Sequence, residues 1–141
     1  MPAAYEHAVV RVVPRVEREE FVNVGVLVFC EAHDVVTMGL ALDEARLLAL
    51  APDLDLDLVR ANLAAMERVA AGGAEAGPIG AMPTRERWRW LVAPRSTMLQ
   101  TSPAHGGVLG KVELPALVER LLDRYVRLQR SLATNATKPS R

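Results

Sequence analysis

The stretch of residues 22–30 constrains the fold of this chain more than any other. It alternates at a period of two, and one face is entirely apolar, comprising Val22, Val24, Val26, Val28 and Cys30. Such a pattern predicts a buried strand. The opposite face carries Asn23 and Gly25, where a strand gains more from branched side chains. We interpret these two exceptions as a sign of a fixed polar contact on that face.

Two neighbouring segments, residues 5–13 and 35–42, also alternate and flank this strand along the chain. Pro14 ends the earlier one, because proline has no N–H to donate to a sheet. Short connections favour antiparallel pairing in chain order. The first 42 residues therefore predict a three-stranded meander.

The side-chain pattern also predicts which residues face one another in this meander. A slip of one residue would turn the apolar face of a strand to the wrong side. One register that brings apolar faces together places Arg11 opposite Asn23 and Gly25 opposite Gly39. The polar and glycine exceptions then gather at one shallow place on the sheet.

Apolar spacing at three and four residues predicts helices over residues 43–51, 56–71 and 115–126. Asp43 is the expected N-cap of the first helix, and Asp53 or Asp55 that of the second. Gly72 and Gly73 end the second helix. Four segments remain. We expect a flexible loop at residues 72–83 and a glycine-rich loop at residues 103–111. Between them we expect a strand at residues 87–93 and a second, short strand at residues 97–102.

The order of these elements predicts an α+β fold. Its antiparallel sheet would comprise the N-terminal meander and one or two later strands, covered on one face by helices. The length of 141 residues suits a single domain, which we expect over residues 1–132. The polar residues 133–141 are expected to form a disordered tail.

Composition excludes several classes of function. The 17 basic and 17 acidic side chains cancel, so no overall charge attracts nucleic acid or membrane. Arginines alternate with Trp88 and Trp90, which could stack bases, but the alternation places both tryptophans on one strand face, as a core would. Nucleic-acid binding is therefore disfavoured. A single cysteine, Cys30, excludes an internal disulfide.

The chain shows no sign of membrane insertion or export. No apolar run reaches the ~20 residues of a membrane span. The N-terminus lacks the basic and then apolar plan of a signal peptide. We expect a cytoplasmic location and no membrane partner.

A first group of candidate site residues, Arg11, Glu20 and Asn23, surrounds the opening strand. A guanidinium beside an amide could bind a carboxylate or another small anion, because it offers a planar fork of donors. In the structural alternative, Glu20 pairs with Arg11 or Arg18, and Asn23 satisfies the backbone at a bulge. The sequence favours the structural alternative and leaves both open.

A second group of candidates lies later in the chain, at Arg95, Ser96, Thr97, Gln100, Ser102 and His105. Ser96 or Ser102 with His105 could form a nucleophile and a base, but no Gly-x-Ser-x-Gly elbow marks the nucleophile. His105 could equally order the glycine loop after it. No phosphate-binding glycine motif and no histidine spacing typical of a metal site is present, so we expect no cofactor and no metal.

Both groups lie in blocks that carry a family resemblance. The first block is VRVVP and REEFVNVGV, residues 10–14 and 18–26, and the second is APRST, QTSP and HGG, residues 93–97, 100–103 and 105–107. Together they resemble the bacterial family called domain of unknown function 3037, over residues 5–126. Glu19 stands where the family pattern has glycine. The resemblance implies a small stand-alone protein of uncharacterised activity and, as a partner, a HipA-like kinase.

Two hypotheses about function follow. The first is a non-catalytic binding or protein-interaction module, because the polar candidates lack a complete catalytic set. The second is a small enzyme that handles an anionic or phosphate-bearing substrate with Arg95, Ser96 and His105. Geometry discriminates between them, because the enzyme needs Ser96 or Ser102 within hydrogen-bond reach of His105 and a pocket beside them.

Overall fold

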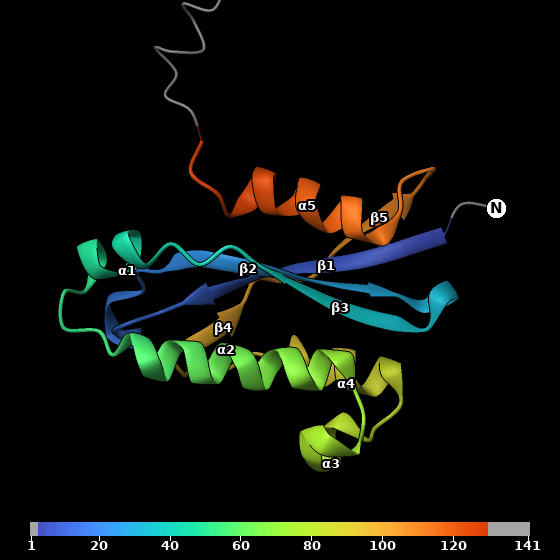
Figure 1. Ribbon diagram of the computed structural model, residues 1–141, viewed down its shortest axis with the longest axis horizontal. Helices are drawn as coiled ribbons and strands as arrows, with labels where there is room; N and C mark the ends of the chain where they lie inside the picture. The colour runs from blue at the N-terminus through green and yellow to red at the C-terminus, as the bar shows by residue number, and fades with distance from the viewer. Residues whose placement is uncertain (1–2, 130–141) are drawn as a thin grey trace, which may run out of the picture.

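A five-stranded antiparallel sheet forms the centre of the protein, which is known from a computed structural model that describes residues 3–129 (Figure 1). The strand order is β3-β2-β1-β4, and β5 also pairs with β1. The strands are β1 Ala3–Val12, β2 Val22–Cys30, β3 Val35–Leu40, β4 Leu99–Thr101 and β5 His105–Leu109. The predicted meander and the predicted strand within residues 97–102 are confirmed.

Within the described residues, five α-helices accompany the sheet: α1 Glu44–Leu50, α2 Leu56–Ala71, α3 Gly77–Gly80, α4 Thr84–Leu91 and α5 Leu114–Tyr125. Three short 3₁₀ turns are η1 Val16–Arg18, η2 Glu31–His33 and η3 Ala74–Ala76. The predicted α+β class is confirmed. The expected loop of residues 72–83 contains η3 and α3, and the expected tail of residues 133–141 lies outside the described residues.

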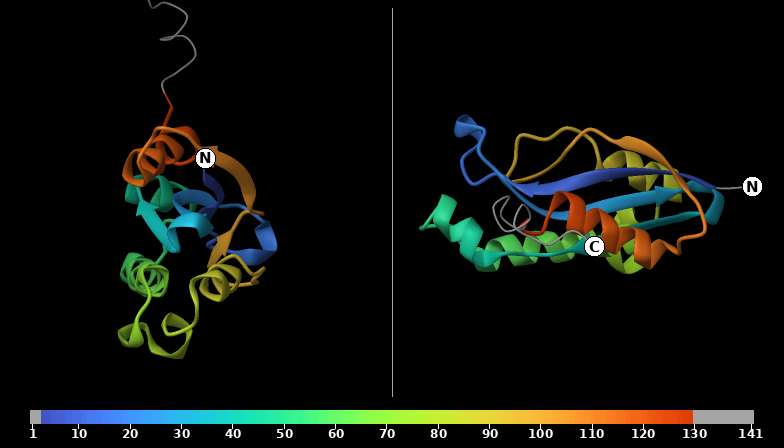
Figure 2. Two further views of the ribbon diagram at one scale, coloured as in Figure 1. Left: turned by 90° about the vertical axis from the view of Figure 1, so that its right-hand side faces the viewer. Right: turned by 90° about the horizontal axis from the view of Figure 1, so that it is seen from above.

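Helices cover both faces of the sheet rather than the one face that we expected (Figures 1 and 2). On one side α2 and α4 pack against β-strand residues such as Leu27 and Phe29. On the other side α5 packs against Val26 and Val28. The prediction failed because both faces of the C-terminal half of β2 are apolar, so each needs its own cover.

A β-bulge in β2 changes the faces that the sequence pattern predicts. Val10 of β1 pairs with Gly25, but the next residue, Arg11, pairs with Asn23, so Val24 is an extra residue. The five apolar residues of the predicted face therefore separate: Val22 and Val24 join the α2 side, and Val26, Val28 and Cys30 join the α5 side.

The predicted register is confirmed for Arg11 opposite Asn23 and wrong by one residue for the glycines. Gly25 pairs with Leu40, and Gly39 pairs with Val26. The turn of residues 31–34 explains the difference, because it makes Cys30 and Val35 partners and so sets every later pair.

Two later elements also differ from expectation. Residues 84–91 form the helix α4 and not a strand, with Arg87, Trp88 and Leu91 buried at helical spacing. The expected glycine loop contains β5, whose backbone pairs with β1. Gly107 leaves room there for the ring of Tyr5, which a side chain at this position would overlap.

Turn and cap residues mostly behave as predicted. Asp43 caps α1 and Asp55, not Asp53, caps α2, each through a bond of 3.1 Å from a backbone N–H. Gly72 ends α2 with a φ of 79°. Glu19, where the family pattern has glycine, has a φ of 55°. Glycine adopts this left-handed conformation more readily than glutamate does.

Candidate functional site

Three polar side chains lie side by side across three strands, and we call them the polar row: Asn23 of β2, Arg11 of β1 and Gln100 of β4. Residues paired in antiparallel strands extend their side chains to the same face. The neighbours of Arg11, Val10 and Val12, belong to the core on the α2 side. The polar row therefore lies on the opposite face, which is the α5 side of the sheet.

The bulge at Val24 is what places Asn23 in this row. Counting back by two from Leu27, which faces α2, a regular strand would turn residue 23 toward α2 as well. The extra residue reverses the alternation, and Asn23 turns toward α5. The bulge thus accounts for the polar residue at position 23, because it moves this side chain from the α2 face of the sheet to the α5 face.

Arg11 is half-buried and has no anionic partner among residues 3–129. Its Nε is enclosed and lacks a hydrogen bond in that part of the chain. The guanidinium carbon lies 4.1 Å from the ring centroid of Phe21, whose side chain is 43% exposed. Burial alone lowers the pKa of Arg11, with no carboxylate to oppose the shift.

Asn23 connects the polar row to the end of α5. Its Nδ2 donates to the carbonyl oxygen of Tyr125 over 3.0 Å, while its Oδ1 is buried without a described partner. Nη1 of Arg46 donates to the next carbonyl, that of Val126, over 2.8 Å. These side chains satisfy carbonyls that the end of the helix leaves free.

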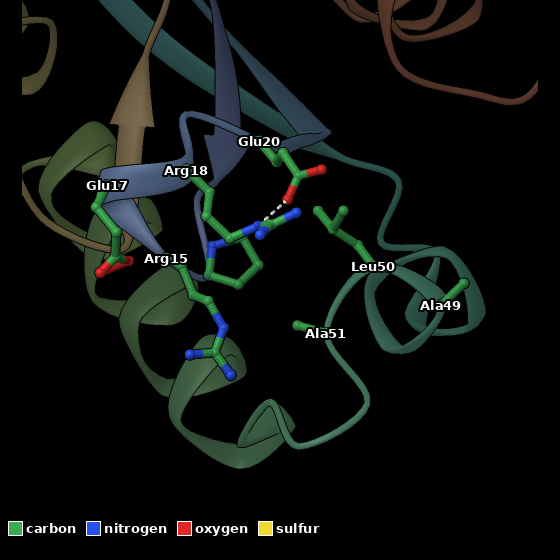
Figure 3. A pocket seen from close by; sticks show the side chains of 8 residues that line it. Arg15, Glu17, Arg18, Glu20, Ala49, Leu50 and Ala51 are labelled. Atoms are coloured by element: carbon green, nitrogen blue, oxygen red, sulfur yellow. Dashed lines mark hydrogen bonds and ion pairs between the residues drawn. The ribbon is translucent and has the colours of Figure 1, made fainter.

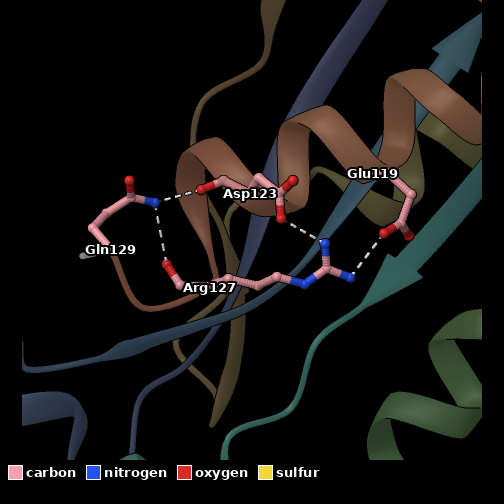
Figure 4. Close-up of polar contacts among 4 residues, drawn as sticks. All are labelled: Glu119, Asp123, Arg127 and Gln129. Atoms are coloured by element: carbon pink, nitrogen blue, oxygen red, sulfur yellow. Dashed lines mark hydrogen bonds and ion pairs between the residues drawn. The ribbon is translucent and has the colours of Figure 1, made fainter. Parts of the chain in front are cut away.

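Exposed ion pairs along α5 hold the same end of the helix (Figure 4). The guanidinium of Arg127 lies 2.9 Å from Glu119 and 2.7 Å from Asp123. The amide of Gln129 donates to the carbonyl of Arg127 over 3.3 Å. The chain beyond α5 is therefore folded back against the helix at the border of the polar row.

An aromatic group lies next to the polar row on the same face. The ring of His7 stacks on Tyr125 at 5.3 Å between centroids and lies 5.6 Å from His105 and 6.2 Å from Tyr5. His7 is 5% exposed, and neither ring nitrogen has a described partner. Burial, followed by the charges of His105 and Arg124, lowers the pKa of His7.

Sequence reasoning placed His105 among the candidates but missed His7 and Tyr125. A signal for His7 was present, because it shares the strand face of Tyr5 and Arg11 at a period of two. No local signal exists for Tyr125, which reaches the site only through the packing of α5.

Glu20 lies apart from the polar row. It pairs with Arg18 over 2.6 Å, as the structural alternative proposed, at a cavity of about 760 Å³ between η1 and the end of α1 (Figure 3). The pairing with Arg18 lowers the pKa of the Glu20 carboxyl. Both groups are exposed, so this ion pair adds little stability.

Arg95, Ser96 and Thr97 lie between α4 and β4, and Arg95 packs on the α2 side of the sheet. The Arg95 guanidinium lies 4.2 Å from the ring centroid of Trp90 and bonds the Trp90 carbonyl. The Thr97 hydroxyl donates to the carbonyl of Leu99 over 2.9 Å. Ser96 is exposed. Arg95 and the polar row thus occupy opposite faces of the sheet.

Ser102 has a structural position at the gap between β4 and β5. Its buried hydroxyl accepts from the N–H of Val9 over 2.8 Å and donates to the carbonyl of Pro103 over 3.0 Å. The amide of Gln100 donates to the carbonyl of Thr97 over 3.0 Å. No hydrogen bond joins either candidate serine to His105 in the described chain. The predicted second group does not form one site.

Neither a metal centre nor a membrane span is found in residues 3–129. In this part of the chain, no three His, Cys, Asp or Glu side chains lie close enough together to hold a metal ion. No described helix has the length and apolar character needed to cross a bilayer. What the polar row can do chemically is to bind an anion through Arg11 and an adjoining amide.

A family model described as Protein of unknown function (DUF3037) matches residues 7–126. The chain belongs to this family. The match spans the polar row, the blocks that carried the resemblance in the sequence, and His7, His105 and Tyr125 of the aromatic group. Searches of curated proteins and of solved structures found no significant match. These comparisons therefore show the family of the chain, and any inference about the function of this DUF3037 protein rests on the site itself.

Proposed function

We propose that this DUF3037 protein is a non-catalytic interaction module whose polar row binds a carboxylate of a protein partner. The observation that carries the proposal is Arg11, a half-buried guanidinium that has no anionic partner among residues 3–129 and whose Nε makes no hydrogen bond there. Because Arg11 is partly removed from water, its charge attracts a bound anion more strongly than the charge of a fully exposed arginine would.

Exposed aromatic side chains at the border of the polar row favour a protein partner over a free anion. Phe21 and Tyr125 expose aromatic surface on either side of Arg11 and Asn23. Tyrosine, arginine and other large side chains dominate the energy of protein interfaces, where apolar contact surrounds a few charged pairs. A free anion would use Arg11 but not these rings.

A catalytic function receives less support from the same geometry. The hydroxyl of Ser102 is committed to backbone groups, and Arg95 lies across the sheet from His105. A nucleophile and its base need to lie within hydrogen-bond reach. The proposal therefore assigns binding, and not turnover, to this chain.

A pull-down and affinity series tests the proposal. The family resemblance makes a HipA-like kinase the first partner to test. The Arg11→Gln variant should bind at least about tenfold more weakly, since it loses a charge-assisted hydrogen bond. Arg89→Gln, which removes an exposed charge from α4, should bind like the unaltered protein. Equal affinity of the Arg11 and Arg89 variants would contradict the polar row as the binding site.

A probe without a known partner gives a second readout. Titration with glutarate should shift the ¹H–¹⁵N resonance of the Arg11 side-chain Nε in a saturable way. The Phe21→Ala substitution should lower the affinity for a protein partner more than the affinity for glutarate, because the ring contributes apolar contact to a protein. A resonance that does not move at any glutarate concentration would refute carboxylate binding at Arg11.

A further inference from the structure

An apolar cavity of about 330 Å³ lies on the opposite face of the sheet, between α2 and the segment that links α4 to β4. Small-molecule sites in proteins have volumes of roughly 300–1,000 Å³ and mostly apolar walls with few polar groups. This cavity has that character, since its floor is formed by Ala65, Met66, Val69, Met98 and Leu99.

Arg95 and Trp90 form the polar end of this cavity. The guanidinium lies over the Trp90 ring at 4.2 Å and donates to the carbonyls of Trp90 and Leu91. An arginine has five N–H donors, so those not used by these two bonds can still bind an anion. The stacking and the two bonds fix the guanidinium in place before any ligand arrives.

The charge of Arg95 has no described carboxylate against it. Among residues 3–129 no ion pair includes Arg95, and burial is the cause that lowers its pKa. Arginine nevertheless keeps its charge at neutral pH. The cavity thus pairs an apolar body with one uncompensated positive charge at its end.

The larger cavity near η1 shows the contrast. Its two arginines already have acidic partners, because Arg15 lies 3.5 Å from Asp53 and Arg18 lies 2.6 Å from Glu20. Half of its lining residues are charged, and the others are Pro14, Leu50 and two alanines (Figure 3). An apolar anion would find neither a free charge nor an apolar wall of comparable extent there.

We propose that the cavity between α2 and Arg95 binds a small apolar monocarboxylate, with the carboxylate on Arg95 and the apolar body against Met66 and Val69. The ring of Trp90, which is 39% exposed, covers the junction between the two parts of the ligand. The site is separate from the polar row, which lies on the other face of the sheet.

Titration of the ¹⁵N-labelled protein with 4-phenylbutyrate tests this site. Saturable shifts should concentrate on residues 62–69 and 97–99. The uncharged analogue 4-phenylbutanol should bind at least about tenfold more weakly, because it lacks the charge-assisted bond to Arg95. Absence of saturable shifts at these residues, or equal affinity for acid and alcohol, would overturn the proposal.

Variants of this chain separate the two parts of the site. Arg95→Gln should remove the preference for the acid over the alcohol, and Arg95→Lys should restore part of it. Ala65→Phe should fill the cavity and abolish binding of both, whereas Ala61→Phe, an exposed position one turn earlier on α2, should not. Full binding by Ala65→Phe, in a variant whose circular dichroism is unchanged, would also overturn the proposal.

The polar row provides an independent check. Arg11→Gln should bind 4-phenylbutyrate as the unaltered protein does, since Arg11 lies on the other face. Loss of binding in Arg11→Gln with retention in Arg95→Gln would assign the ligand to the polar row and refute the cavity.

Discussion

The side-chain amide of Asn23 donates to the carbonyl of Tyr125, which is 102 residues later in the chain, over 3.0 Å. This bond connects β2 to the end of α5 at the point where the polar row meets the aromatic group. Asn23→Ala should lower the free energy of unfolding by about 1 kcal/mol, the usual net value of such a bond. Urea denaturation measures it. Asn62→Ala, on the exposed side of α2, should change stability by less than about 0.5 kcal/mol, and equal effects would refute a specific role for Asn23.

Arg87 should prove to be a structural arginine. It is 8% exposed, and its guanidinium donates to the carbonyls of Met82, Val69 and Ala70 at 3.2, 3.0 and 2.6 Å. Arg87→Met should cost roughly 2–4 kcal/mol in urea denaturation, because several buried carbonyls lose their donor. The exposed neighbour gives the control, since Arg89→Met should remain within about 0.5 kcal/mol. A small effect at residue 87 would show that water replaces the guanidinium.

Stability should fall below neutral pH because of His7. Its pKa in the folded protein is lower than the ordinary value of 6.5, mainly through burial, and Tyr5, His105, Arg124 and Tyr125 offer it no anion. The unfolded chain therefore binds a proton first as the pH falls through 6.5, and unfolding becomes easier. Above that pH, both states hold a neutral ring and the effect vanishes.

Urea midpoints at pH 5, 6, 7 and 8 measure this dependence. His7→Phe keeps an aromatic ring and should flatten the curve between pH 5 and 7. His33→Gln, in the exposed turn η2, should leave the curve unchanged. A His7→Phe curve as steep as that of the unaltered protein would show that other groups cause the loss.

Gly25 should tolerate no side chain. A Cβ at this position would lie 2.6 Å from the carbonyl oxygen of Gly39, which is backbone and cannot turn away. Gly25→Ala should therefore destabilise the protein by on the order of 2 kcal/mol, within the range for overpacking a core. Gly106→Ala meets only an ordinary contact at 3.9 Å and should be close to neutral. Thermal unfolding of the two variants compares them, and similar melting temperatures would contradict the close approach of β2 and β3.

Ser102→Ala should lower the stability of the protein, because the Ser102 hydroxyl has a structural role. The hydroxyl is the partner of the buried N–H of Val9, which would be left unsatisfied at a cost of roughly 1–3 kcal/mol. Ser96→Ala, at an exposed position, should be neutral. Urea denaturation separates the two, and a Ser102→Ala protein of full stability would reopen a chemical role for this hydroxyl.

The sequence predicted most of the sheet because its strands alternate strongly and its turns carry proline or charged residues. It also predicted that Arg11 faces Asn23. Its structural alternative placed Asn23 at a bulge, but the sequence did not identify Val24 as the extra residue, because the valines at every second position also fit an unbroken alternation. The helix α4 was taken for a strand, since four residues of alternating arginine and tryptophan fit both periods. The strand β5 was taken for a loop because of its glycines, since it is stabilised by pairing with β1 and not by its own side chains.

The candidate site could be predicted only in part for a related reason. Arg11, Asn23 and Gln100 were all named, but their alignment depends on the pairing of β4 with β1, which joins segments about 90 residues apart. His7 and Tyr125 meet only when α5 packs on the sheet. Local pattern identifies polar residues that are out of place, and tertiary pairing decides which of them act together.

The central position of β1 has a consequence for the order in which this protein can form. One edge of β1 pairs with β2 soon after both are made, but the other edge is completed only by β4 and β5, at residues 99–109. During synthesis on the ribosome, the N–H and C=O groups on the second edge of β1 therefore stay unpaired until β4 and β5 have been made. A chaperone or partner that binds the nascent chain would find its exposed edge in this interval.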